Sequence, residues 1–292
     1  MFKFEFDAIG TSWEIDTLKP LAVALQRCIL DRIERFDACY SRFRTDSLVA
    51  RIAAANTGGT FEFPDDSIRL FDLYDRLHVM THGAVDPLVG RDLELLGYDA
   101  EYSLRHDPLA IARYSQERRS WAVDVARRGS RITTQRPVVI DLGAAGKGYL
   151  VDIVADILRS AGNREFVVDG GRDLVHAGLK PLDVGLEHPS DPGLVIGIAH
   201  LDGRALCASA INRRAWGQFH HIIDARTGVP VRDVIATWVI ANDAMTADSL
   251  ATALFFTAPD QLSEVFQFSF ARMFADGRAE SSPNFDGELF TR

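Results

Sequence analysis

Apolar residues occupy every second position from Phe2 to Phe6, the spacing of a β-strand with one buried face. A turn at residues 10–12 leads to a second short strand at residues 13–16, so we expect an antiparallel hairpin. Pro20 then opens a helix, whose apolar positions recur at helical spacing as far as Phe36.

The next hundred residues predict two more helices and then a return to alternation. A short helix is expected at residues 47–55 and a longer one at about 66–80. Residues 99–120 are polar and weakly patterned, and no element is assigned there. Alternation at residues 121–125 and a run at 131–134 predict two strands around a turn at Gly129.

The middle of the chain has the strongest pattern. A β-branched run at residues 138–140 predicts a strand, which we expect to join the two preceding strands in one antiparallel meander. A glycine-rich loop follows, and an amphipathic helix runs from Lys147 to the stop at Gly162. Another strand is expected at residues 166–168.

Short apolar runs separated by turn residues dominate the rest of the chain and predict antiparallel strands. These runs lie at residues 184–186, 195–199, 205–208 and 235–241. A helix is expected at 244–256, another helix after Pro259, and a closing strand at 272–274. We find no repeat or linker, so we expect a single domain over residues 1–292, of α+β class, with antiparallel sheets packed with helices.

The helix that begins at Lys147 resembles a phosphate cradle, because a glycine-rich loop and a helix start favour an anion. A Walker loop is excluded, since Asp141 and Gly148 stand where that motif needs a glycine and a hydroxyl residue. The dinucleotide fingerprint fails at Asp141 as well. Gly170 and Gly171 follow the next strand and would let a ligand approach the backbone. An ordinary turn with a surface lysine is the alternative.

Asp248 and Thr252 are four residues apart on the expected helix and therefore share a face. Their oxygens are hard donors, which suit Mg²⁺ that keeps other positions for phosphate and water. A solvated Asp, with a Thr bonded to its own helix, is the alternative. Together with Lys147 and the strand-ending Asp141 and Asp169, the pair suggests a metal-assisted site for a pyrophosphate.

Composition narrows the function classes. With 292 residues, of which 47% are hydrophobic, the chain can bury a large core. The net charge of -9 and the lack of a basic block argue against nucleic acid as a partner. Three cysteines without a C-x-x-C pair predict reduced thiols. No secretory signal and no apolar run of membrane-spanning length are seen, so a cytoplasmic location is expected.

Several short motifs, in a fixed order along residues 8–257, together resemble the ApbE family, the FAD:protein FMN transferases. They are Gly10-Thr11 with Trp13, Ser41-x-Phe43-x-x-Asp46-Ser47, Gly83-Ala84-Val85-Asp86-Pro87, Ile140-Asp141-Leu142-Gly143 with Lys147-Gly148-Tyr149 and Asp152, Gly170-Gly171, His221-Ile222-Ile223-Asp224 with Thr227-Gly228 and Pro230, and Ala247-Asp248 with Ala251-Thr252-Ala253. Ile9 replaces a methionine often found in the family, and Ala225 replaces a proline.

The resemblance implies a T-fold-like enzyme that uses Mg²⁺ to transfer FMN from FAD to a Thr or Ser hydroxyl of an acceptor protein, with release of AMP. By position, Asp248 and Thr252 match metal ligands, and Ala144 matches a carbonyl donor. His221 matches the histidine motif, near the phosphates or the acceptor hydroxyl, and with Lys147 and Asp248 it completes the expected catalytic set. The matching flavin-nucleotide contacts are Phe43, Ala84, Val85, Asp86, Asp141, Lys147, Gly170 and Gly171.

Two other functions stay open. A Mg²⁺-dependent FAD diphosphatase would use the same metal and phosphate residues, with water in place of the acceptor hydroxyl. A non-catalytic FAD-binding protein would hold the dinucleotide intact. The general base is either His221 or one of the aspartates.

Overall fold

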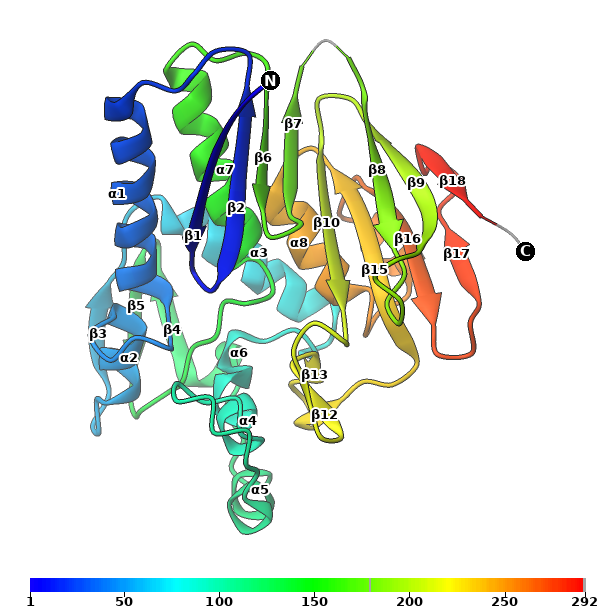
Figure 1. The fold of residues 1–292 in the computed structure, drawn as a ribbon. Helices are drawn as coiled ribbons and strands as arrows, with labels where there is room; N and C mark the ends of the chain where they lie inside the picture. Colours follow the sequence, from blue (N-terminus) through cyan, green and yellow to red (C-terminus); the bar gives the residue numbers. More distant parts are fainter. Residues whose placement is uncertain (179, 291–292) are drawn as a thin grey trace. The chain divides into compact units, whose positions relative to one another are not determined.

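An eight-stranded sheet packs against the two helices that carry Lys147 and Asp248 (Figure 1). The computed structural model describes residues 1–178 and 180–290. In hydrogen-bonding order, the strands are β1 (Phe2–Ala8), β2 (Thr11–Thr17), β6 (Phe166–Gly170), β7 (Leu174–Ala177), β10 (Ala205–Ala210), β15 (Val234–Ala241), β16 (Ser269–Phe274) and β17 (Ala279–Ser281). Every described neighbouring pair is antiparallel, and the first hairpin is confirmed.

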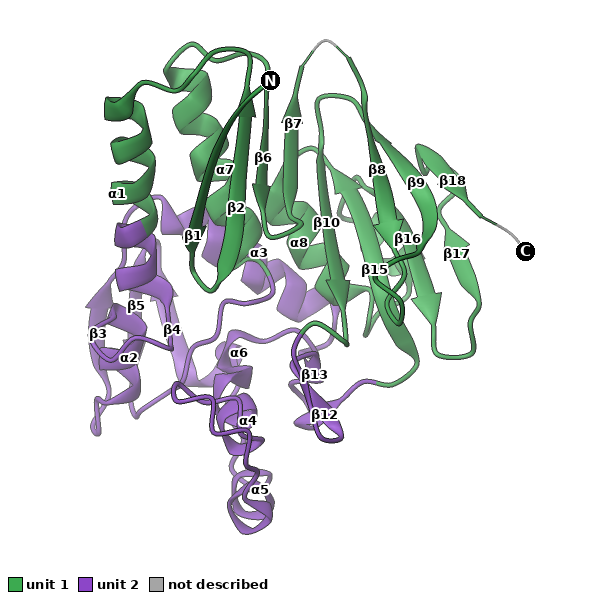
Figure 2. Ribbon diagram, in the orientation of Figure 1, with its two compact units in different colours: residues 1–33, 145–213, 232–292 green, residues 34–144, 214–231 purple. Residues whose placement is uncertain are grey.

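Contacts divide the chain into two compact units, which Figure 2 shows in different colours. Unit 1 comprises residues 1–33, 145–213 and 232–292, and unit 2 comprises residues 34–144 and 214–231. Helix α1 (Val23–Tyr40) begins in unit 1 and ends in unit 2. The single domain expected from the sequence stays a prediction.

Unit 1 places the eight-stranded sheet between a smaller sheet and a helical layer. Along β15, Ala236, Trp238 and Ile240 pack in one apolar cluster with residues of the smaller sheet. The residue between the first two, Thr237, faces the other way and donates from Oγ1 to the Ala251 carbonyl, at 2.7 Å. The smaller sheet, in hydrogen-bonding order, is β18 (Gly287–Leu289), β9 (Val195–Leu201) and β8 (Leu182–Glu187); the helices are α7 (Gly146–Ser160), α8 (Ala244–Ala253) and α9 (Pro259–Ser263).

Helices α7 and α8 approach each other closely at Gly148. A Cβ atom on Gly148 would lie 2.2 Å from the Ala244 carbonyl oxygen, so only glycine allows this approach. The two carboxylate oxygens of Asp152, on α7, accept from the backbone N–H groups of Ala244 and Met245, each at 2.8 Å. This carboxylate therefore satisfies otherwise unpaired donors at the start of α8 and fastens the two helices together.

Unit 2 combines a three-stranded sheet with short helices and two small hairpins. The sheet order is β3 (Gly59–Glu62), β5 (Arg131–Thr134) and β4 (Val125–Arg128). The helices are α2 (Leu48–Ala53), α3 (Ser67–Met80), the 3-10 turn η1 (Pro87–Val89), α4 (Gly90–Leu95), α5 (Pro108–Tyr114) and α6 (Trp121–Asp124). The hairpins are β11 (Ala215–Trp216) with β12 (Phe219–His220), and β13 (Ile223–Asp224) with β14 (Val229–Pro230).

The predicted meander is wrong in two places. Residues 138–140 form no strand, because this segment runs beside the start of α4, where a Cβ on Gly90 would be 2.8 Å from the Val139 carbonyl oxygen. Trp121 starts the helix α6 instead of a strand, because its indole N–H donates to Asp75 at 2.7 Å. Strand β5 consequently pairs with β3 and β4.

The structure also bears on several smaller expectations. The helix expected at residues 244–256 ends at Ala253, and α5 forms within the unassigned residues 99–120. Cys28, Cys39 and Cys207 are free thiols. Within the described residues, no helix is both long enough and apolar enough to cross a lipid bilayer.

The approach at Gly148 leads to a stability prediction. Gly148→Ala should lower the free energy of unfolding by about 3 kcal/mol, because the new methyl group meets backbone atoms that cannot move aside cheaply. Chemical denaturation would measure the change. Ser160→Ala, at the exposed end of the same helix, is the matched control and should change it by less than about 0.5 kcal/mol. Equal stability of both variants would contradict the packing argument.

Candidate functional site

Lys147 lies in the first turn of α7, where the sequence predicted a phosphate partner. Its ammonium group lies 2.7 Å from Oδ2 of Asp173, which is fully buried, and donates to the Gly171 carbonyl at 3.2 Å. Burial by itself would lower the pKa of Lys147, but the negative charges of Asp173 and Asp248 outweigh it and raise the pKa. The lysine is therefore a fixed positive charge, held within unit 1.

Asp248 and Thr252 lie one turn apart on α8, as predicted. Asp248 is buried, and its Oδ2 accepts from the Gly148 N–H at 2.9 Å. The close contact between α7 and α8 thus positions the predicted metal-binding carboxylate beside the lysine that follows the glycine-rich loop.

The third predicted metal donor, Ala144, closes the first segment of unit 2, directly before Ala145 at the start of α7. Among the described residues, no group of three or more His, Cys, Asp or Glu side chains could hold a metal ion. A set of one carboxylate, one hydroxyl and one carbonyl still suits Mg²⁺, which often shares its coordination with substrate phosphates and water. The metal site stays a prediction.

Gly170 and Gly171 have a packing role in the structure. A Cβ on Gly170 would lie 2.6 Å from the Val151 side chain, and a Cβ on Gly171 would lie 2.1 Å from Thr11 Oγ1. Gly171 also has a positive φ of 66°. The glycine pair therefore allows the first hairpin to close over the end of β6, and the Gly171 carbonyl also holds Lys147.

Asp141, in unit 2, pairs with an arginine that the sequence analysis did not identify. Arg42 Nε donates to Asp141 Oδ2 at 2.5 Å, and Arg42 Nη1 donates to the Tyr98 carbonyl at 2.8 Å. Burial would raise the pKa of Asp141, but the charge and hydrogen bond of Arg42 lower it. The carboxylate is ionised, and the buried Nη2 of Arg42 has no hydrogen-bond partner among the described residues.

Phe43 belongs to the same cluster. The Arg42 guanidinium lies over its ring, 4.2 Å from the centroid. Tyr102 stacks on Phe43 at a centroid distance of 5.2 Å and an interplanar angle of 12°, and Tyr98 meets it edge-on at 5.3 Å. Phe43, which the resemblance matches to a flavin-nucleotide contact, is thus one ring of a larger aromatic group.

His221 is electrostatically coupled to this cluster. Burial, followed by the nearby charge of Arg214, lowers the pKa of His221 to about 3. The imidazole is therefore neutral at pH 7, and its Nδ1 has no hydrogen-bond partner among the described residues. Asp141 acts in the opposite direction on the same pKa, so unit 2 brings Phe43, Asp141 and His221 into one environment.

The Ala84–Asp86 segment forms a well-fastened loop. Asp86 is buried and accepts from the backbone N–H groups of Leu88, at 2.8 Å, and Trp121, at 2.9 Å. His78 Nδ1 lies 3.2 Å from Asp86 Oδ2, and this carboxylate raises the pKa of His78. The Ala84 carbonyl accepts from the Ala225 N–H at 3.0 Å, which joins the loop to the histidine motif. Asp86 therefore holds the loop in place.

Sequence reasoning missed several polar and aromatic neighbours of the predicted residues. Arg42 lies directly before Phe43, and Asp173 lies two residues after Gly171, so both are close to motifs that were recognised. Tyr102 falls in the unassigned segment. The position of Arg42 and Asp173 beside recognised motifs was the sequence signal that could have identified them.

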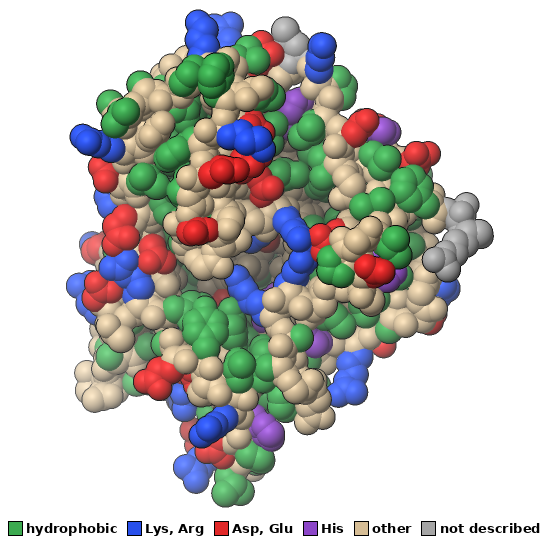
Figure 3. Space-filling view, viewed as in Figure 1, with side chains coloured by type: hydrophobic (Ala, Val, Ile, Leu, Met, Phe, Trp, Pro, Cys, Tyr) green, Lys and Arg blue, Asp and Glu red, His purple; other side chains and the backbone are tan. Residues whose placement is uncertain are grey.

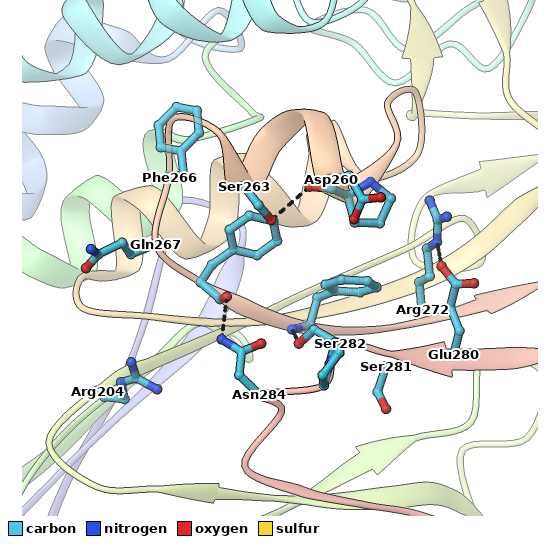
Figure 4. A pocket seen from close by; sticks show the side chains of 14 residues that line it. Arg204, Asp260, Ser263, Phe266, Gln267, Arg272, Glu280, Ser281, Ser282 and Asn284 are labelled. Carbon is cyan, nitrogen blue, oxygen red and sulfur yellow. Dashed lines mark hydrogen bonds and ion pairs between the residues drawn. The ribbon is translucent and has the colours of Figure 1, made fainter.

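A pocket of about 750 Å³ opens between α9 and strands β16 and β17 (Figure 4). None of the 14 side chains that line it belongs to the predicted site. Several of its polar groups already have partners: Arg272 donates to Glu280 at 2.6 Å, and Asn284 donates to the Phe268 carbonyl at 3.2 Å. The pocket therefore gives no indication of the expected chemistry. On the face drawn in Figure 3, acidic and basic side chains are interspersed.

Comparison with known proteins agrees with the resemblance seen in the motifs. The model of the ApbE family matches residues 9–273. A FAD:protein FMN transferase of Klebsiella pneumoniae is 26% identical over 275 residues, covering 88% of this chain and 79% of that protein. Another, from Vibrio cholerae, is 28% identical and covers 84% of this chain and 78% of its own length.

A solved structure supports the same assignment. The ApbE protein of Thermotoga maritima is 26% identical and superposes with a TM-score of 0.84, covering 98% of this chain and 99% of its own. The expected α+β class is confirmed. With a family match over nearly the whole chain, this protein belongs to the ApbE family.

Proposed function

We propose that this protein is a FAD:protein FMN transferase that moves FMN from FAD to a Thr or Ser hydroxyl of an acceptor protein and releases AMP. The observation that carries the proposal is the placement of Lys147 and Asp248 by the α7–α8 contact, in a chain of the ApbE family. A partly exposed cation, held by a fully buried carboxylate and close to a second carboxylate, suits a phosphate-handling site better than a purely structural helix pair.

The reaction balances with one bond formed and one broken. The acceptor oxygen forms a bond to the FMN phosphorus, and the bond from that phosphorus to the oxygen shared with AMP breaks. The acceptor proton passes to a base, and AMP leaves with the shared oxygen. Lys147, fixed by Asp173, supplies positive charge for the phosphate oxygens without having to be reoriented.

Asp248, Thr252 and the Ala144 carbonyl are the residues that would hold Mg²⁺. Their oxygens are the donor type that this ion prefers, and a bound Mg²⁺ would neutralise charge on the pyrophosphate. Asp248 is already positioned by the Gly148 N–H, so its carboxylate does not need to be ordered first.

The residues of unit 2 support the binding of an anionic aromatic nucleotide. Arg42 and Arg214 lie beside the Tyr98 ring, with their guanidinium carbons 5.0 and 5.9 Å from its centroid. His221 is neutral and can accept a proton, so we assign it as the base that receives the acceptor proton.

Asp248→Ala should abolish FMN transfer, because it removes the single carboxylate of the proposed metal set. Mass spectrometry after incubation with FAD, Mg²⁺ and an acceptor domain bearing a Thr would show the added FMN. Asp156→Ala, an exposed carboxylate on α7, is the control and should retain activity.

An acceptor-free reaction tells the alternatives apart. FMN and AMP formed equally without acceptor would identify a diphosphatase, and FAD left intact by the wild type would indicate a binding protein. Full transfer by Asp248→Ala at ordinary Mg²⁺ would refute the metal assignment.

The low pKa of His221 predicts the pH profile of the transfer. The acid limb of kcat/KM reports the pKa of the base in the free enzyme, and protonation below that pKa stops the reaction. With the pKa lowered to about 3, kcat/KM should stay level as the pH falls from 8 to about 5 and should decline only at lower pH.

His221→Gln should lower kcat by roughly 10²-fold or more, whereas His106→Gln, at an exposed position of unit 2, should not. An acid limb near pH 6.5 that disappears in His221→Gln would contradict this prediction. It would show that the imidazole has its ordinary pKa and that burial does not lower it.

A further inference from the structure

Tyr102 is the outermost ring of the aromatic cluster in unit 2. It stacks on Phe43 and meets the Tyr98 ring edge-on, at a centroid distance of 5.6 Å and an angle of 77°. Whereas Tyr98 is 5% exposed, Tyr102 keeps 54% of its surface in solvent. The cluster therefore presents Tyr102 as its exposed ring.

The loop that carries Tyr102 is fastened in this position. Asp99 Oδ1 accepts from the backbone N–H groups of Glu101, at 3.1 Å, and Ser103, at 2.9 Å. The Tyr102 N–H donates to the Asp99 carbonyl at 3.1 Å, and the Leu104 N–H donates to the Gly97 carbonyl at 2.8 Å. These bonds offset the cost of holding Tyr102 at a φ of 51°, which is unfavourable for an aromatic residue.

The Phe43 ring, beneath Tyr102, is surrounded by other groups of the cluster. The Phe43 ring already contacts the Arg42 guanidinium, the edge of Tyr98 and the face of Tyr102. Phe43 keeps part of its surface in solvent, but Tyr102 is the more exposed ring of the stack and offers a planar ligand the larger free surface. Because exposed aromatic rings lose little conformational freedom when a ligand stacks on them, Tyr102 is a low-cost stacking surface.

We propose that Tyr102 stacks against a planar ring of FAD and thereby takes the contact that the motif pattern assigns to Phe43. The inference rests on the proposed function, since it needs a flavin nucleotide as ligand. It makes the fastened 99–104 loop part of the substrate site, and it gives Phe43 the role of supporting Tyr102 from beneath.

Titration of the full-length protein with FAD, monitored by calorimetry, tests the proposal. Tyr102→Ala should weaken FAD binding on the order of tenfold, because it removes the whole ring. Tyr102→Phe keeps the ring and should stay within about twofold of the wild type. Leu109→Ala is the matched control and should leave FAD binding unchanged, since Leu109 is a large exposed side chain of the same unit outside this loop. In the transfer reaction, Tyr102→Ala should raise KM for FAD and leave kcat nearly unchanged.

Separate titrations with FMN and with AMP identify the ring. A loss of affinity confined to FMN would assign the flavin, and a loss confined to AMP would assign the adenine; both support stacking. Unchanged FAD affinity in Tyr102→Ala would overturn the inference alone. Tighter binding would overturn it too, since Tyr102 would then be a cover over Phe43. A wild-type protein that binds no FAD would overturn the proposed function together with it.

Discussion

The close approach of α7 to α8 at Gly148 fixes the positions of the expected site residues of unit 1. Because residue 148 has no side chain, its N–H reaches Asp248 Oδ2, and the residue before it, Lys147, lies in the same first turn of α7. Asp152 then bonds the first N–H groups of α8. One short contact thus sets the direction of α8, the position of its carboxylate and the location of the lysine. A larger residue at position 148 would disturb all three.

Each unit contains a largely buried ion pair that includes a predicted site residue: Lys147 with the fully buried Asp173 in unit 1, and Asp141 with Arg42 in unit 2. Removing two charges from water costs several kcal/mol per ion, and an apolar pair of equal volume is often as stable. Stability therefore does not explain these pairs well. The proposed function supplies a reason, since charges that are held in place before a ligand binds need not reorganise during a reaction.

The sequence predicted those elements whose structure is determined by residues within the same segment. The first hairpin and helices α7 and α8 follow from periodicity within the segment itself, and they were found. Residues 138–140 have the composition of a strand, but they lie against α4, and no local pattern reveals that neighbour. The Arg42–Asp141 pair joins residues 99 positions apart, so no local pattern could show that these two residues are partners. Lys147, Asp248 and Thr252 were predictable because helical spacing and loop composition are local.

Some residues of the family motifs maintain the fold, whereas others are expected to contact a ligand. The two groups differ in whether their polar atoms already have hydrogen-bond partners within the protein. Asp86 has its acceptors filled by backbone donors, and Gly171 is required by contact with Thr11, so both are explained by the fold. Arg42 Nη2 and His221 Nδ1 are buried without hydrogen-bond partners among the described residues. A buried polar atom without a hydrogen-bond partner lowers the stability of the fold by about 1–3 kcal/mol. Nothing in the described part of the fold compensates for this loss. We propose that a bound ligand supplies the missing partners of these two atoms, which would account for that loss.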